Sequence, residues 1–286
     1  MTTGARLLGL LTDFGMSDGY VGVMKAVILG IAPEARLVDL SHDVAPQDIE
    51  GGAWILGTAW RSFPERSVLL CVIDPGVGSA RRAIALEAHG RIFVGPDNGL
   101  FTYPLAKVDD KAPPRCVLLD DPTYHLPAPS ATFHGRDIFA PCAAHLAAGA
   151  PLTALGSPVD SATLTRLPIE LRARRHGDVV TGRVAHIDHY GNLITSIGPA
   201  LARVALREPL AYVSLARHVV TARASHFSGG PQAEPFFLQD SSGALAIVLR
   251  DGSAAVALGA RRGDEVTLRG LSAASLEQAG DEEEQG

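Results

Sequence analysis

Residues 7–40 read LLGLLTDFGMSDGYVGVMKAVILGIAPEARLVDL, and the spacing of their apolar residues changes twice. The apolar runs at 7–11 and 37–40 are typical of short buried strands. Between them, Asp18 is the expected N-cap of a helix that ends before Pro33 and whose apolar residues recur at helical spacing: Tyr20, Met24, Val27, Ile28 and Ile31. A strand, a helix and a second strand in this order predict a βαβ unit with parallel strands.

The alternation continues through the first half of the chain. Residues 137–148 predict another helix, and so do apolar residues at helical spacing further upstream: Ile49, Ala53, Leu56 and Trp60. More short apolar runs predict strands at 68–73, 84–86, 92–94 and 117–119. Residues 1–165 are therefore expected to form an α/β domain around a mostly parallel central sheet.

The second half has a different texture. Proline, glycine and arginine interrupt the pattern at 166–177, which we expect to be a linker. Beyond it, short β-prone runs alternate with turn residues: 179–187, 193–197, 212–215, 244–249 and 265–268. We expect an all-β domain at 178–272, either a barrel or a sandwich, and a disordered tail at 273–286 that is too acidic to pack.

The composition excludes several classes of protein. The net charge of −6 and the lack of a large basic cluster argue against a nucleic-acid partner. The three cysteines lack CxxC spacing, so neither a disulfide framework nor a structural zinc site is expected. No signal-peptide pattern opens the chain and no apolar run approaches the roughly 20 residues of a membrane helix. We expect a cytoplasmic protein that acts on a small molecule and binds no membrane.

Two loops carry groups that can hold and polarise a water molecule. Asp74 and Arg81 lie in a glycine-containing loop after the predicted strand at 68–73, and His134 lies just before a predicted helix. The plain alternatives are a structural ion pair and a structural histidine. The loop is no phosphate-binding fingerprint, because it lacks the third glycine and the Lys-Ser/Thr that such loops require.

Asp13 directly follows the first predicted strand, at the sheet edge where open α/β folds bind ligands. Its carboxylate can accept hydrogen bonds from vicinal ribose hydroxyls, or it can cap the next helix. A metal site built on Asp13, His42, Asp43 and His134 is another interpretation. These residues lack the HxxxH, HExxH and HxH spacings of metal sites, so no metal is expected.

The second half has a dense group of polar residues at 186–192, which read HIDHYGN. They predict either a hairpin turn, with Gly191 and Asn192 supplying positive φ, or a site in which Asp188 binds an ammonium group and Asn192 a base edge. The turns at 240–243 and 250–253 either line the same cleft or merely connect strands.

Motifs along nearly the whole chain resemble those of the S-adenosylmethionine hydroxide adenosyltransferases, relatives of the adenosyl-fluorinases and adenosyl-chlorinases. Their order and completeness carry the resemblance: Leu11-Thr12-Asp13-Phe14-Gly15, Leu40-Ser41-His42, Pro46-Gln47-Asp48-Ile49, Asp74-Pro75-Gly76-Val77-Gly78, Gly95-Pro96-Asp97-Asn98-Gly99-Leu100, Thr132-Phe133-His134-Gly135-Arg136-Asp137, Tyr190-Gly191-Asn192 and Gly252-Ser253-Ala254-Ala255.

The resemblance implies an N-terminal α/β domain, a C-terminal β domain and a homotrimer that binds S-adenosylmethionine where neighbouring subunits meet. No separate cofactor is implied. The implied water-activating set is Asp74, Arg81 and His134. The implied substrate contacts are Asp13 at the ribose, Asp188 and Ser241 at the methionine, Asn192 and the turn with Asp251 and Ser253 at the adenine, apolar walls from Phe133, Tyr190 and Phe227, and further contacts from Gln47 and Ser242.

Departures from the fluorinases indicate the branch of the family. The fluorinases carry tyrosine at the positions of Asp74 and His134, and tryptophan at that of Gln47. A halide nucleophile needs a dry, neutral pocket, which an aspartate and a histidine would keep wet. The resemblance therefore implies hydrolysis rather than halogenation.

The expected reaction is displacement at the 5′ carbon of S-adenosylmethionine by water, which gives adenosine and methionine. His134 is the expected base, with Asp74 and Arg81 orienting the water; Arg81 lowering the pKa of the water directly is the alternative. Three other functions remain open: a non-catalytic sensor of S-adenosylmethionine or adenosine, a chlorinase-like halogenase, and a metal-dependent hydrolase.

Overall fold

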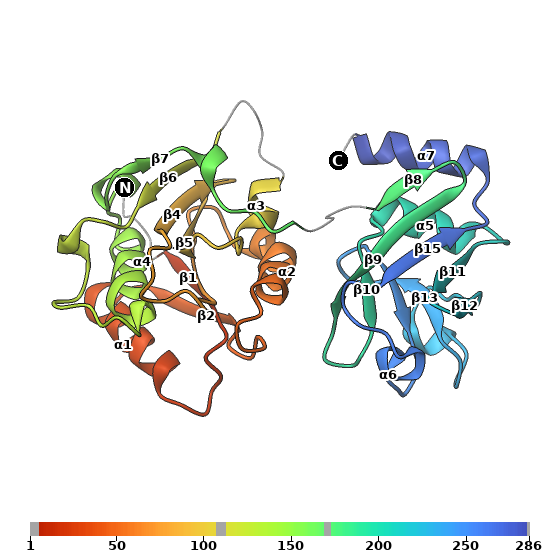
Figure 1. Cartoon of the computed structure of the whole chain (residues 1–286), viewed down its shortest axis with the longest axis horizontal. Coiled ribbons are helices and arrows are strands. Elements are labelled where there is room, and N and C mark those ends of the chain that lie inside the picture. The colour runs from red at the N-terminus through yellow and green to blue at the C-terminus, as the bar shows by residue number, and fades with distance from the viewer. Residues whose placement is uncertain (1–5, 107–112, 169–172, 285–286) are drawn as a thin grey trace. The chain divides into compact units, whose positions relative to one another are not determined.

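The computed structural model describes residues 6–106, 113–168 and 173–284, with side chains as far as residue 280 in the last helix. The chain divides after Pro168 into two compact units, close to the predicted end of the first domain at residue 165. Helices cover a sheet in the first unit, and the second unit contains a strongly curved sheet (Figure 1).

The first unit is built on a seven-stranded sheet in the order β2-β1-β3-β5-β4-β6-β7. Strands β2, β1, β3 and β5 pair in parallel, so the predicted parallel core is confirmed. Strands β4, β6 and β7 pair antiparallel. The strands are β1 (Leu7–Thr12), β2 (Arg36–Ser41), β3 (Val68–Val72), β4 (Ala83–Ala88), β5 (Arg91–Pro96), β6 (Arg115–Leu118) and β7 (Pro158–Val159).

A two-residue turn explains why the sheet is mixed. His89 and Gly90 join β4 to β5, with φ of 51° and 69°. Positive φ at both central residues is the geometry of a tight hairpin turn, and such a turn can connect only antiparallel strands.

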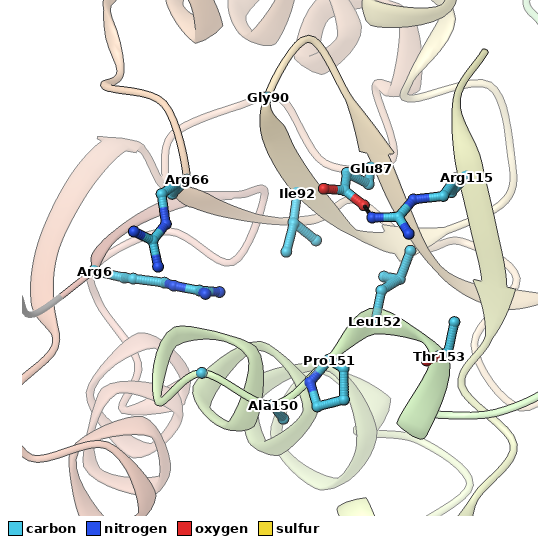
Figure 2. A pocket seen from close by; sticks show the side chains of 11 residues that line it. Arg6, Arg66, Glu87, Gly90, Ile92, Arg115, Ala150, Pro151, Leu152 and Thr153 are labelled. Carbon is cyan, nitrogen blue, oxygen red and sulfur yellow. Dashed lines mark hydrogen bonds and ion pairs between the residues drawn. The ribbon is translucent and has the colours of Figure 1, made fainter. Parts of the chain in front are cut away.

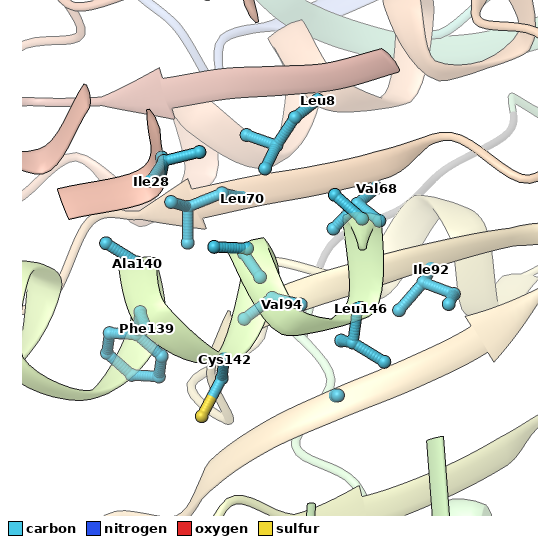
Figure 3. Packing of buried hydrophobic residues seen from close by; sticks show 14 of the residues in the cluster. Leu8, Ile28, Val68, Leu70, Ile92, Val94, Phe139, Ala140, Cys142 and Leu146 are labelled. Atoms are coloured by element: carbon cyan, nitrogen blue, oxygen red, sulfur yellow. The ribbon is translucent and has the colours of Figure 1, made fainter. Parts of the chain in front are cut away.

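Helices cover both faces of this sheet. On one face α1 and α4 pack on the strands, and Figure 3 shows Ile28 near Leu70 and Leu146 near Val94 and Ile92. On the other face lie α2 and α3. The helical segments of this unit are α1 (Tyr20–Ile31), α2 (Ile49–Ala59), α3 (Thr102–Ala106), α4 (Ala140–Ala147), the 3-10 turns η1 (Trp60–Ser62), η2 (Pro122–Tyr124), η4 (Leu152–Ala154) and η5 (Ser161–Thr163), and the π-helical turn η3 (Gly135–Phe139).

The predicted cap of α1 is wrong. Gly19 occupies the N-cap position and no side chain bonds to the first turn there, so Asp18 lies one residue too early. Asp48, by contrast, caps α2 and accepts a 2.9 Å hydrogen bond from Gly51 N. A cap requires its side chain to face the free amides at the helix start, and sequence fixes that position only to within a residue or so.

The second unit contains an antiparallel, nearly closed barrel in the order β12-β11-β15-β9-β10-β14-β13. A barrel rather than a sandwich is thus the outcome of the all-β prediction. Strand β8 pairs with β9 and lies within the predicted linker, whose residues 169–172 are outside the described part. The strands are β8 (Arg174–His176), β9 (Val179–Ile187), β10 (Leu193–Thr195), β11 (Tyr212–Leu215), β12 (His218–Val220), β13 (Phe236–Gln239), β14 (Leu245–Val248) and β15 (Glu265–Arg269).

Helices also pack on this barrel: α5 (Pro199–Arg207), α6 (Ala254–Leu258) and α7 (Ala273–Glu284). The 3-10 turn η6 (Phe227–Gly229) precedes β13 and has no buried residue. Helix α7 replaces most of the predicted disordered tail. Leu276 and Ala279 are three residues apart on one face of α7 and are buried in the core of the unit, which offsets the acidic composition. None of the described helices combines the length and apolar composition needed to cross a bilayer.

Candidate active site

Two parallel strands of the first unit deliver carboxylates to the same edge of the sheet. Thr12 at the end of β1 pairs with Val72 at the end of β3, so Asp13 and Asp74 follow neighbouring strand ends. Ligands of open α/β folds bind at this edge. Asn98 holds the β3 end by donating a 2.8 Å hydrogen bond to Ile73 O.

The predicted trio of Asp74, Arg81 and His134 is brought together. Arg81 Nε donates to Asp74 Oδ1 and Oδ2 at 2.9 and 3.0 Å, and Arg81 Nη2 bonds to His134 Nδ1 at 2.8 Å. The Arg81 and Asp74 side chains are only 11% and 5% exposed. The Arg81 guanidinium also lies 5.0 Å above the ring of Phe139 in η3. Asp74 and Arg81 are therefore more than a simple ion pair, because the Arg81 guanidinium also bonds to the imidazole of His134.

A close backbone contact holds the two loops together. Gly78 has a φ of +77°, and a Cβ there would lie 2.4 Å from Ala131 O. Only glycine allows loop 74–81 to approach the segment before His134 this closely.

Gly78→Ala should destabilise the first unit by about 1–3 kcal/mol through backbone strain and should also move Arg81 away from His134. We expect a lower melting temperature together with a lower kcat. Gly177→Ala is the matched control, since Gly177 has a φ of +62° but open space around its Cβ position. Equal kcat values for the two variants would show that the loop contact has no bearing on activity.

The bond between Arg81 and His134 determines the tautomer of the imidazole. A guanidinium can only donate, so Nδ1 must accept and the proton of the neutral ring is on Nε2. Burial, and then the nearby Arg81 charge, lower the pKa of His134 below its ordinary 6.5. His134 is therefore neutral at pH 7 and offers an N–H donor at Nε2 rather than a free lone pair.

Asp13 is half-buried and is fixed by the loop before α2. Gln47 N donates a 2.7 Å hydrogen bond to Asp13 Oδ2, and Gln47 itself has a φ of 66°. Asp13 makes no side-chain cap to α1, so the capping alternative is not what the structure shows. The exposed Gln47 side chain and the remaining carboxylate oxygen of Asp13 stay available to a ligand.

Phe133 belongs to an aromatic cluster that sequence reasoning found only in part. Its ring lies 5.8 Å from Phe14 and 5.1 Å from Tyr20, both edge-on. Phe14 follows Asp13 directly, and Tyr20 opens α1 and is 50% exposed. The available signal was that both follow Asp13 closely in the sequence, Phe14 in the β1–α1 loop and Tyr20 at the start of α1.

His42 faces its own neighbours instead of the trio. Its Nδ1 lies 2.8 Å from Thr12 Oγ1 and its Nε2 lies 3.2 Å from Asp39 Oδ1, and the residue is 4% exposed. His42 O also accepts a hydrogen bond from Gly15 N. In the described part of the chain, no three His, Cys, Asp or Glu side chains gather as metal ligands. The set of Asp13, His42, Asp43 and His134 therefore does not form a metal-binding group here.

In the second unit, the turn between β9 and β10 is organised by Asp188. Asp188 Oδ1 accepts from Tyr190 N and Asn192 N at 2.9 Å each, and Oδ2 accepts from Asn192 Nδ2 at 2.8 Å. The hairpin interpretation holds, but Gly191 alone has positive φ. A carboxylate has about four acceptor positions, so Asp188 retains about one for a ligand.

Tyr190 and Ser253 lie at the same end of the barrel. Ala255 N donates to Gly191 O at 2.9 Å, and a Cβ on Gly191 would lie 2.0 Å from Ser253 Oγ. The Tyr190 ring is 75% exposed beside this contact. Asp251 is exposed and has a φ of 57°, and the preceding Arg250 reaches Ser228 O beside the exposed Phe227. The loops that carry these residues therefore lie next to one another.

Ser241 and Ser242 lie elsewhere. Their turn precedes β14, whereas Ser253 follows it, and β14 pairs antiparallel with β10. Ser241 and Asp188 thus occupy turns at opposite ends of β14, although the resemblance assigns both to the methionine. In the turn that contains Ser241 and Ser242, Asp240 Oδ1 accepts hydrogen bonds from Ser242 N, Ser242 Oγ and Ala244 N.

Comparison with known proteins identifies the family. Residues 8–156 match the model of the SAM hydroxide adenosyltransferase N-terminal domain, and residues 182–267 match that of the C-terminal domain. The chain belongs to the SAM hydroxide adenosyltransferase family. Among its relatives is the (R)-S-adenosyl-L-methionine hydrolase of Thermus thermophilus, 43% identical over 92% of this chain and 99% of that protein.

More distant members of the same group are fluorinases. That of an Actinoplanes species is 30% identical over 68% of this chain and 72% of its own. Among solved structures, an uncharacterized conserved protein from Thermotoga maritima aligns with a TM-score of 0.83 and 34% identity, covering 91% of this chain and 99% of its own. The chain therefore shares its fold with a solved structure over most of its length.

Proposed function

We propose that this member of the family hydrolyses S-adenosyl-L-methionine to adenosine and L-methionine. The bonded trio of Asp74, Arg81 and His134 carries the proposal, because it places a carboxylate, a guanidinium and an imidazole N–H at a ligand-binding sheet edge. The similarity to an (R)-S-adenosyl-L-methionine hydrolase along almost the whole chain supports it.

The reaction is a substitution at the 5′ carbon. The oxygen of water forms a bond to this carbon, the carbon–sulfur bond breaks, and the sulfur leaves with the electron pair as the neutral thioether of methionine. No acid is needed at the leaving group. The water loses one proton to the bulk solvent, so the protein's task is to stabilise hydroxide character on the water oxygen.

The tautomer of His134 indicates how the water is activated. Both Arg81 and His134 Nε2 present N–H donors, and donors aimed at an oxygen favour its deprotonated form. Asp74 holds the guanidinium in place. We therefore assign activation to hydroxide stabilisation by these donors and not to proton removal by the imidazole, which was the expectation from the motif alone.

The other proposed substrate contacts are divided between the two units, each of which would hold a different part of the substrate. Asp13, Gln47 and Phe133 would hold the ribose side in the first unit. In the second unit, Asn192, Tyr190, Phe227, Asp251 and Ser253 would surround the adenine. Asp188 would use its remaining acceptor position for the ammonium group of the methionine. Ser241 and Ser242 lie at the opposite end of β14, so they would reach the methionine of a site shared with a neighbouring subunit.

Incubation with S-adenosylmethionine in ¹⁸O-labelled water tests the proposal. We expect ¹⁸O at the 5′ hydroxyl of adenosine and an equal amount of methionine, both measured by mass spectrometry. Tight binding with no methionine released over hours would indicate a sensor instead. A 5′-chloro product formed in chloride would indicate a halogenase.

The rate should fall on the acid side with a midpoint below pH 6.5. The lowered pKa of His134 means that the ring stays neutral until the pH drops through that value. Once protonated, Nδ1 becomes a donor and repels the Arg81 N–H. NMR titration of His134 should give the same midpoint, and His145→Gln is the control, because burial also lowers the pKa of His145. A kinetic midpoint above 6.5 would contradict the assignment.

We also propose a homotrimer with active sites shared between neighbouring subunits, as the resemblance implies. Light scattering should then give about three times the 30.0 kDa chain mass. The three free, buried cysteines are compatible with a reducing compartment, and we propose a cytoplasmic location.

A further inference from the structure

A hollow of about 240 Å³ lies at the edge of the first unit's sheet opposite to Asp13 and Asp74. Arg6 precedes β1 whereas Asp13 follows it, and Arg66 precedes β3 whereas Asp74 follows it. Figure 2 shows the side chains of Arg6 and Arg66 close to each other and directed into this hollow. The pocket is thus separated from the candidate active site by the length of the strands.

The charges of the pocket do not balance. Of its three guanidiniums, that of Arg115 is paired with Glu87, the lining carboxylate. Arg6 Nη1 donates a 2.6 Å hydrogen bond to Leu146 O near the end of α4. Within the described residues the Arg66 guanidinium makes no hydrogen bond or ion pair. Two positive charges therefore lie together in a chain whose net charge is −6.

The protein keeps these two groups together at a cost. Burial, and then the proximity of Arg66, lower the pKa of Arg6, and the nearby Glu87 carboxylate only partly offsets this repulsion. The backbone of Arg66 has a φ of 68°, and the backbone N–H of Arg66 donates a 2.6 Å hydrogen bond to Gly90 O. An anion between the guanidiniums would convert repulsion into attraction.

The rest of the wall is apolar. Ile92, Pro151 and Leu152 line the pocket beside the arginines (Figure 2). A ligand that fills the space would combine an anionic head with a small apolar body. Planar guanidinium forks match the oxygens of phosphoryl and carboxylate groups, and two uncompensated charges favour the doubly charged phosphoryl group.

We propose that this pocket binds a small organic phosphomonoester, with its phosphoryl group between Arg6 and Arg66 and its organic part against Ile92 and Leu152. The proposal does not depend on the reaction at the other sheet edge.

Calorimetric titration with phenyl phosphate tests this site. We expect phenyl phosphate to bind more tightly than either inorganic phosphate or benzoate. Arg6→Gln and Arg66→Gln should each weaken binding by about 10- to 100-fold, the loss typical of a hydrogen bond to a charged group. Arg66→Lys should lose less affinity for phenyl phosphate than Arg66→Gln, because lysine keeps the positive charge although it lacks the planar guanidinium.

The control is Arg217→Gln, which makes the same change of charge on an exposed residue of the second unit. It should bind phenyl phosphate as the unaltered protein does, and saturating adenosine should not displace the ligand. Any of four results would overturn the proposal: no binding by the unaltered protein, undiminished binding by both pocket variants, an equal loss in Arg217→Gln, or tighter binding of benzoate.

Discussion

Arg81→Met should lower kcat for S-adenosylmethionine hydrolysis by about 10³-fold while KM changes little, since removing one preorganised donor typically costs 10²–10³-fold. Arg81 is expected to have the larger effect within the trio because it bonds to both other members. Its loss removes the donor, frees the imidazole and leaves the Asp74 carboxylate, whose side chain is 5% exposed, without its cation. Adenosine release measured by chromatography under saturating substrate gives kcat directly.

Stability must be separated from chemistry in this experiment, because breaking a buried ion pair typically costs about 3–5 kcal/mol. Arg82 is the matched control. Arg82 Nε donates to Asp97 Oδ2 at 2.7 Å, and the Asp97 side chain is 4% exposed. Arg82→Met should therefore lower the melting temperature to a similar degree, but kcat much less. If both variants keep similar kcat values, Arg81 has no part in catalysis.

His134→Gln should keep most of the activity, within about tenfold, whereas His134→Ala should lose about 10²–10³-fold. Glutamine presents an N–H near the position of imidazole Nε2, so it preserves the donor that the observed tautomer provides. It cannot act as a base at neutral pH. The comparison of these two variants therefore distinguishes hydroxide stabilisation from general base catalysis.

A base mechanism gives a different pattern. Both variants would then lose the 10²–10⁴-fold that a general base typically contributes, and glutamine would restore nothing. In addition, Arg81→Met should raise the pKa of His134 toward 6.5, because the guanidinium charge is one cause of its lowering. An unchanged NMR titration of His134 in that variant would contradict the direct coupling of the two residues.

Much of the first unit could be predicted because its signals are local. The apolar run of β1 and the helical spacing of α1 lie within one stretch of sequence, and their order implies parallel strands. Asp13 could be placed at the ligand-binding edge of the sheet for the same reason, whereas the pairing of β1 with β3 showed that Asp74 lies at that edge too. The cap of α1 was predicted one residue too early, because a sequence fixes a helix start only to within a residue or so. The tail at 273–286 was predicted to be disordered, because the burial of Leu276 and Ala279 depends on residues far along the chain.

The sequence by itself determined the parallel core, the change to a β-rich second half and the residue types of the trio, because periodicity, turn residues and motif order are properties of neighbouring positions. Only the tertiary structure decided that Arg81 bonds to His134 Nδ1, that Asp188 orders its own turn, and that Arg6 meets Arg66. Those contacts join residues that are distant in the chain or depend on side-chain direction. The tautomer of His134 and the excess positive charge around Arg6 and Arg66 depend on distances between these side chains, and a sequence pattern does not give those distances.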